Sequence, residues 1–210
     1  LPAGKVPETH ALIFGLTLGV ASFGVLALFV NLLSALLALS AIVFYVVIYT
    51  MWLKRTTPQN IVIGGAAGAV PVLVGWAAVT NSIGLAAIWM FLIIFLWTPP
   101  HFWALSLVLQ KDYQRAGIPM LPVVRGEAET YRQIIVYTLV LIAASLGLVV
   151  THIMGTFYLV GALLLGGGLV VLGVRLARSG RLADARRLFW FSNYYLALLF
   201  AVMVLDRVLR

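Results

Sequence analysis

Seven apolar stretches dominate the chain and limit what it can fold into. They span residues 10–30, 33–53, 60–80, 85–110, 134–152, 157–177 and 189–206. Each is close to the roughly 17–25 residues that a helix needs to cross a bilayer. Only 10% of the 210 residues are charged, against about 25% in ordinary soluble domains. The pattern excludes a soluble, disordered or fibrous protein. It predicts an all-α, polytopic transmembrane helical bundle that forms one domain over residues 1–210.

The charged residues are distributed unevenly between the connectors. All Lys and Arg residues except Arg207 and Arg210 precede the first stretch or follow the second, fourth and sixth stretches. The net charge of +8 would suggest nucleic-acid binding in a soluble protein, but here the cations lie in short loops and indicate orientation. By the positive-inside rule, we expect cytoplasmic charged loops and an external C-terminus. The absence of cysteine excludes disulfides and cysteine-ligated metals.

The connector after the second stretch has the composition of an anion site. Lys54 and Arg55 end that stretch, and Thr57 and Pro58 are residue types that cap and begin a helix. A helix N-terminus presents free N–H groups, and the amides at 59–60 add further donors. Together these groups suit a phosphate. The alternative is that the two cations only anchor the helix at the lipid headgroups.

The connector after the fourth stretch contains Asp112 near the membrane boundary, among several Lys and Arg residues. One carboxylate can share a divalent cation such as Mg²⁺ with a phosphate. A local ion pair is the alternative. Residues 119–122 are apolar but rich in proline, so we expect a loop that covers the site. Glu127 and Glu129 are two residues apart and could serve as ligands, but we expect solvated charges in the first turn of the next helix, where the helix dipole favours them.

Two consecutive prolines interrupt the fourth stretch. Pro99 and Pro100 lack N–H groups, which frees the carbonyls of Phe95 and Leu96 and predicts a break in the helix. His101 follows within the bilayer, where an ionisable residue suggests function. The alternative is a buried neutral histidine bonded to a freed carbonyl. Three neighbouring aromatic side chains would suit a flat or polyunsaturated ligand: Trp97, Phe102 and Trp103. His101 and Asp112 would lie about 16 Å apart on a straight helix, which predicts separate charged and apolar sites.

Three blocks, residues 49–69, 97–105 and 112–124, resemble the UbiA-type intramembrane prenyltransferases, in particular the branch that farnesylates heme. The resemblance implies a bundle of nine helices. It also implies two aspartate motifs that hold Mg²⁺ on a prenyl diphosphate, and a bacterial cell membrane as the location. Residues 1–4 resemble the segment that follows the first of those motifs. We therefore expect the seven helices to match the third to ninth of the family, and this chain alone to have little activity.

The resemblance also assigns roles to residues. Asp112 is the implied metal ligand, and Lys54 and Arg55 are the implied diphosphate-binding cations. Further implied substrate-binding residues are Tyr49, Asn60, Trp97, His101, Trp103, Lys111 and Arg115, with His101 orienting or ligating heme.

The implied reaction transfers a farnesyl group from farnesyl diphosphate to a vinyl group of heme B, which gives heme O. The implied partners are the lipid bilayer and heme A synthase or a terminal oxidase assembly, and no nucleic acid. Three alternatives stay open: prenylation of an aromatic or quinone precursor, a multi-pass transporter, and a non-catalytic assembly subunit.

Overall fold

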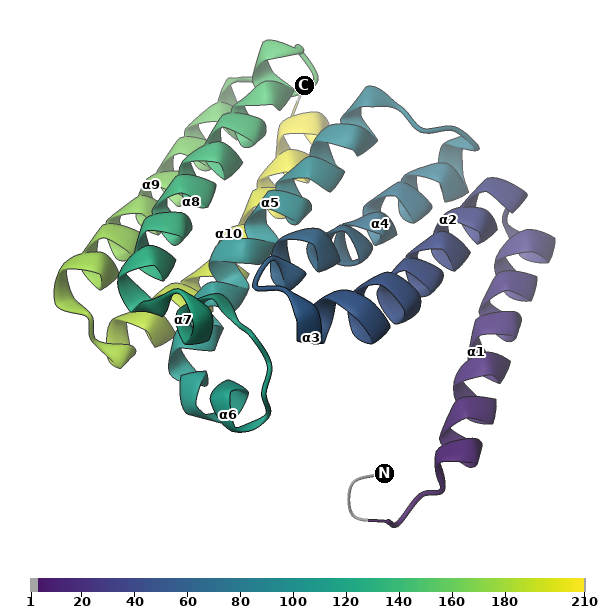
Figure 1. Ribbon diagram of the computed structural model, residues 1–210. Helices are drawn as coiled ribbons and strands as arrows, with labels where there is room; N and C mark the ends of the chain where they lie inside the picture. The colour runs from purple at the N-terminus through teal and green to yellow at the C-terminus, as the bar shows by residue number, and fades with distance from the viewer. Residues whose placement is uncertain (1–3, 210) are drawn as a thin grey trace.

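Long helices account for most of the computed structural model, which describes residues 4–209 (Figure 1). Residues 1–3, where part of the family resemblance falls, lie outside the described residues. Seven helices are long and apolar enough to cross a membrane, as the sequence predicts. They are α1 (Glu8–Phe29), the continuous span Leu32–Thr56, α4 (Asn60–Thr80), α5 (Leu85–Val108), α8 (Gly126–Val150), α9 (Thr156–Ser179) and α10 (Leu182–Val208).

The second span changes its helical type along its length. It begins as α2 (Leu32–Val43), continues as the π-helix η1 (Phe44–Leu53) and ends in the short helix α3 (Lys54–Thr56). π-Helices are rare, and they occur most often at functional sites. Two further short helices, α6 (Gln110–Arg115) and α7 (Leu121–Val124), follow α5.

Some predicted boundaries differ from the structure. Helices α8 and α10 begin at residues 126 and 182, earlier than the apolar stretches, because their first turns are polar. Helix α5 continues through Pro99 and Pro100, so the predicted break is wrong. The fixed φ of proline is compatible with a helix, and α5 is enclosed by α4, α8 and α10. Residues 121–124 form α7, with Pro122 in its first turn, where the expectation was a loop.

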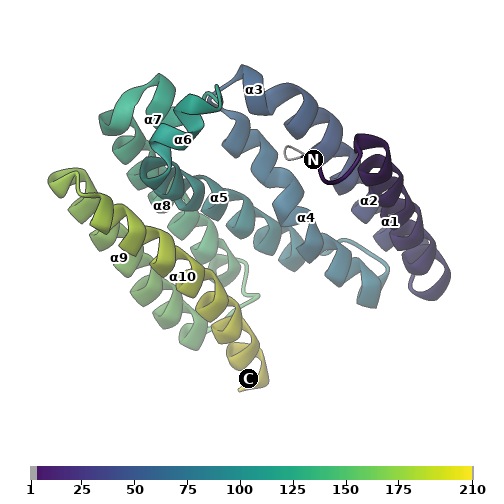
Figure 2. The same ribbon diagram turned by 90° about the horizontal axis from the view of Figure 1, so that it is seen from below.

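The helices form a packed group and an open arm. Helices α5, α8, α9 and α10 contact one another in a ring, and the hydrophobic core lies among them. Helices α4, α2 and α1 extend from α5 in that order, so that α1 lies at the edge and contacts only α2. Figure 2 shows this row of helices from below. Helix α1 has no buried residue, as expected for apolar side chains that face lipid.

A carboxylate from the last helix holds the start of α9. Asp206 is buried, and its two oxygens accept hydrogen bonds from the backbone N–H groups of Gly155 (2.7 Å) and Tyr158 (3.0 Å). No side chain within α9 caps this N-terminus. Asp206 therefore satisfies N–H groups that helix starts leave unpaired, and it joins the start of α9 to the end of α10.

Candidate functional site

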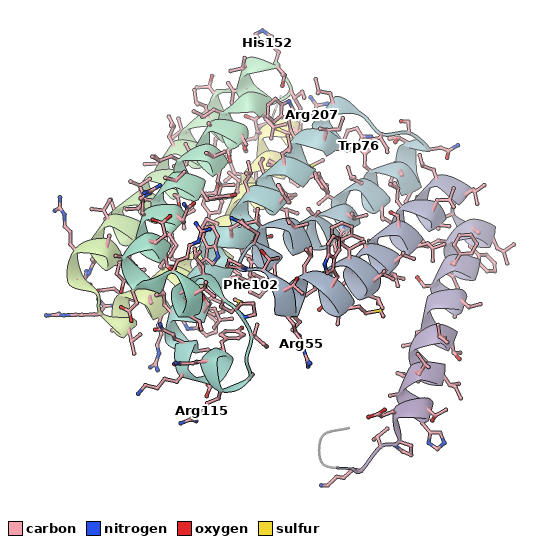
Figure 3. The ribbon with its side chains drawn as sticks, viewed as in Figure 1. Arg55, Trp76, Phe102, Arg115, His152 and Arg207 are labelled. Carbon is pink, nitrogen blue, oxygen red and sulfur yellow. The ribbon has the colours of Figure 1, made fainter. Side chains whose placement is uncertain are left out.

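The charged connectors lie at one end of the bundle. Helices α3, α6 and α7 and the turn between α9 and α10 share that end (Figure 1). Arg55 and Arg115 project from it, whereas His152 and Arg207 lie at the opposite end (Figure 3). The structure thus brings the predicted cationic connectors together on one face of the molecule.

The N-cap predicted at Thr57 is wrong, because α4 begins at Asn60 with Gln59 in the N-cap position and no side-chain cap. The backbone at Thr57 is extended, and its hydroxyl oxygen accepts a hydrogen bond from the N–H of Gln59 at 3.2 Å. The regular helix starts at Asn60, slightly later than expected. The Asn60 side chain is fully buried, and its amide nitrogen donates to the carbonyl of Thr57 at 2.8 Å. Its Oδ1 atom has no hydrogen-bond partner among the described residues.

Lys54 and Arg55 border a cavity of about 390 Å³ at the charged end. Lys54 is half-buried and Arg55 is exposed. The other lining residues are Thr50, Met51 and Ile118. Ile118 belongs to the segment between α6 and α7, so that segment contributes to the wall, but none of residues 119–122, the predicted cover, lines the cavity. Leu121 and Met120 are instead buried against the bundle, so the residues after Ile118 anchor the segment.

A second, apolar cavity of about 250 Å³ lies between η1, α4 and α5. Aromatic, glycine and small side chains line it: Tyr45, Tyr49, Ile61, Gly64, Gly65, Gly68, Ile94, Trp97, Thr98 and Phe102. Two glycines let side chains of this wall pack closely against α4. A Cβ atom at Gly64 would collide with the Tyr49 ring, and one at Gly65 would lie 3.0 Å from the Thr98 methyl carbon.

The π-helix connects the two cavities. The N–H of Lys54 bonds to the carbonyl of Tyr49, so the two residues lie one π-turn apart. Tyr49 faces the apolar cavity, and Lys54 lines the charged one. Tyr113 of α6 lies close enough to Tyr49 for an electrostatic interaction. Burial raises the pKa of the Tyr113 hydroxyl, so this group remains a hydrogen-bond donor at neutral pH.

His101 lies on the side of α5 that packs against α10. Its ring stacks between Trp97 and Phe189, with centroid distances of 4.2 Å and 4.6 Å. Its Nδ1 atom is 2.7 Å from the hydroxyl oxygen of Ser192, which itself donates to the carbonyl of Phe189. The single Ser192 proton is therefore used, and His101 Nδ1–H is the donor. The partner of the histidine is thus a hydroxyl, where the sequence analysis offered a freed carbonyl.

The two predicted tryptophans have different positions. Trp97 lines the apolar cavity, and its indole N–H donates to the carbonyl of Ser192 at 2.7 Å. Trp103 is buried and packs edge-to-face on Tyr137 of α8, with the ring centroids 5.2 Å apart. The structure therefore places Trp103 against α8, and it is not among the residues that line the cavity.

Asp112, Lys111 and Arg115 lie on α6 and face solvent. The Asp112 side chain is 69% exposed, and its nearest cation is Arg115 at 3.9 Å. Neither is among the residues that line the Lys54–Arg55 cavity. The structure therefore puts Asp112 at the same end as the cavity without directing its carboxylate into it.

At the charged end, one carboxylate can contact a metal ion. Among residues 4–209, no group of three or more His, Cys, Asp or Glu side chains is placed to hold a metal. Glu127 accepts from the Tyr131 hydroxyl, and Glu129 accepts from Gln133, in the first turn of α8 as expected. Asp112 thus offers a single carboxylate, which suits an Mg²⁺ ion held mainly by substrate phosphates and water.

Sequence reasoning missed Tyr45, Ser192 and Phe189. Tyr45 packs against Tyr49 with a ring-centroid distance of 5.2 Å, and its position four residues before Tyr49 was the available signal, because such residues share one face of a helix. Ser192 and Phe189 contact His101 although they lie 91 and 88 residues later in the chain, so only the fold brings them together. A polar residue opposite an intramembrane histidine was the one available signal for that contact.

Comparison with known proteins gives consistent matches. The model of the UbiA prenyltransferase family matches residues 1–200. A protoheme IX farnesyltransferase of Roseiflexus sp. (strain RS-1) is 53% identical over 208 residues, which is 99% of this chain and 39% of that protein. One of Gloeobacter violaceus (strain ATCC 29082 / PCC 7421) is 54% identical over 209 residues, 99% of this chain and 68% of that protein. The chain thus spans well under half the length of the first of these relatives.

A solved structure of digeranylgeranylglyceryl phosphate synthase has a similar fold. Its TM-score is 0.76 at 18% identity, and the match covers 98% of this chain and 72% of that one. At this identity the likeness shows the arrangement of the helices alone.

Proposed function

The chain belongs to the UbiA prenyltransferase family, and on that premise we propose that it transfers a farnesyl group from farnesyl diphosphate to a vinyl group of heme B. The supporting observation is the pair of cavities that share η1. One is cationic and lies at the charged end, and the other is apolar and lies within the bundle. Such a pair suits a substrate with an anionic head and an apolar tail. The names of the relatives support heme as the acceptor.

Lys54 and Arg55 bind the diphosphate in this proposal. Guanidinium and ammonium groups form strong, charge-assisted hydrogen bonds with phosphate oxygens. The diphosphate gains negative charge as the bond to carbon C1 of the farnesyl group breaks. Cations already in place stabilise that charge without reorganising. Tyr113, which interacts with Tyr49, and Asn60 are further substrate-binding residues in this proposal.

The apolar cavity holds the isoprenoid next to the acceptor. Tyr49, Trp97 and Phe102 present aromatic surfaces, and Gly64 and Gly65 allow Tyr49 and Thr98 to pack against α4. Enclosure by these side chains excludes water, which would otherwise capture the allylic cation. Trp97 is fixed by its hydrogen bond to Ser192, and His101 is locked against the same serine. We propose that this pair orients heme through Trp97, with His101 as its support.

The proposed transfer breaks one bond in farnesyl diphosphate and forms one bond to heme. The C1–O bond of farnesyl diphosphate breaks, and the electron pair leaves with the diphosphate. The terminal vinyl carbon of heme forms a bond to C1, which leaves a cation on the carbon next to the porphyrin. Water adds to that carbon and loses a proton, which gives the hydroxyethyl-farnesyl side chain of heme O. When bound, Mg²⁺ supplies further charge neutralisation of the diphosphate, and Asp112 is the residue of this chain that would hold it.

We also propose the orientation and the later use of the product. The positive-inside rule places the charged end in the cytoplasm and the C-terminus outside. Heme A synthase or a terminal oxidase assembly would consume the product.

The test is to incubate the complete protein with farnesyl diphosphate, heme B and Mg²⁺, and to measure pyrophosphate and heme O. We expect both products in equal amounts. Pyrophosphate release that depends on an aromatic or quinone precursor would refute heme as the acceptor. No pyrophosphate with any acceptor would refute prenyl transfer and favour a transporter or assembly subunit. In the same assay, Asp112→Asn should lower turnover by orders of magnitude, and an unchanged rate would remove Asp112 from the metal site.

A further inference from the structure

The turn between α9 and α10 collects a second group of cations. Five arginines occur within it and the adjoining helix ends: Arg175, Arg178, Arg181, Arg186 and Arg187. All five are exposed. Nitrogen-bearing side chains project from this corner in Figure 3. The corner shares no lining residue with the two cavities described above, and the proposed farnesyl transfer does not use it.

A buried aspartate fixes two of these arginines. Asp184 accepts hydrogen bonds from Arg187 at 3.1 Å and from the Ser179 hydroxyl at 2.7 Å, and it forms an ion pair with Arg175, whose Nε is 2.9 Å away. The Asp184 side chain is 3% exposed, but those of Arg175 and Arg187 remain 54% and 58% exposed. Each guanidinium has five N–H donors, so most donors stay available to a ligand. The pairing holds the arginines in place, and their charges outnumber that of the single aspartate.

An open groove of about 520 Å³ leads away from these arginines along α9. Its lining changes from cationic to apolar along the helix: Ser179, Arg178, Arg175, Val174, Val171 and Val170. The arginine end is the last turn of a candidate membrane span, and the valines lie one to two turns deeper. The cations are therefore at the level of lipid headgroups, and the valines are at the level of acyl chains.

We propose that this groove binds one anionic phospholipid. Arg175 and Arg178 hold the phosphodiester, and one acyl chain lies along the valines. Charge complementarity favours an anion, because cations exceed anions at this corner. The valines that line the rest of the groove favour a lipid, because a free phosphate has no apolar part that could contact them. A zwitterionic lipid would place its own cation among the arginines and is disfavoured.

The test measures lipid dissociation constants of the purified protein by native mass spectrometry, with phosphatidylglycerol and phosphatidylcholine as probes. Wild type should bind phosphatidylglycerol more tightly. Arg178→Gln should weaken that binding about fivefold, the effect of one cation near an anionic surface. Arg178 has no hydrogen bond or ion pair among the described residues, so the variant should fold. Arg178→Lys should retain most of the affinity. Arg207→Gln is the matched control, because it removes the same charge at the opposite end (Figure 3).

Three results would overturn the proposal. The first is equal affinity for the two lipids. The second is equal weakening by Arg178→Gln and Arg207→Gln. The third is displacement of phosphatidylglycerol by millimolar inorganic phosphate, which would identify a phosphate site without a lipid role.

Discussion

Replacing Asp206 tests whether its carboxylate stabilises the contact between the start of α9 and the end of α10. Its carboxylate accepts two backbone hydrogen bonds, at 2.7 Å from Gly155 and 3.0 Å from Tyr158. A hydrogen bond to a charged group contributes about 1.5–3 kcal/mol. Asp206→Ala removes both bonds and leaves N–H groups at the α9 start unpaired, so the free energy of unfolding should fall by about 3–6 kcal/mol. Asp206→Asn keeps one acceptor oxygen and should lose about half of that.

The measurement is a titration with sodium dodecyl sulfate in mixed micelles, followed by helical circular dichroism. Glu8→Gln is the control, since Glu8 is an exposed acid in the first turn of α1. The control should change the free energy of unfolding by less than about 1 kcal/mol. A loss for Asp206→Ala no larger than that of Glu8→Gln would refute the capping role.

Two further substitutions test the interior of the site. Gly64→Ala should force the Tyr49 ring to move in the apolar cavity and raise the KM for farnesyl diphosphate. The control Gly75→Ala is on the same helix, does not line that cavity and would place its Cβ within 4 Å of nothing, so it should leave the KM nearly unchanged. Equal effects of the two variants in steady-state kinetics would contradict the steric argument. Ser192→Ala removes the acceptor of His101 Nδ1–H and should lower the free energy of unfolding by about 1–3 kcal/mol. Ser192→Thr keeps a hydroxyl and should be closer to wild type. Equal stability of the two variants would show that this hydrogen bond does not stabilise the protein.

Local sequence signals predicted those parts of the fold that depend on neighbouring residues. Apolar length predicted the seven spans, because a helix long enough to cross a bilayer needs a continuous apolar stretch. The Thr57–Pro58 pair predicted a break before α4 but not its N-cap, which is Gln59. Hydropathy missed the starts of α8 and α10, because the first turns of both helices are polar and lie outside the apolar stretches.

Contacts between distant residues could not be predicted. The Asp206 cap joins positions about 50 residues apart, and the His101–Ser192 contact joins positions 91 apart. The π-helix has no sequence signature, yet its register puts Tyr45 and Tyr49 on one cavity and Lys54 on the next. The charges of Lys54 and Arg55 were enough to predict an anion site. The direction of the Asp112 side chain depends on how α6 packs, which the sequence does not show.

The central claim is that Lys54 and Arg55 bind the diphosphate of the prenyl substrate. The most direct measurement is the dissociation constant of farnesyl diphosphate in the absence of heme, for wild type, Lys54→Gln, Arg55→Gln and the control Arg207→Gln. Each of the first two variants should weaken binding by about 10–100-fold, the loss of a charge-assisted contact worth about 1.5–3 kcal/mol, and the control should match wild type. Affinities for Lys54→Gln and Arg55→Gln equal to that of Arg207→Gln would contradict the claim.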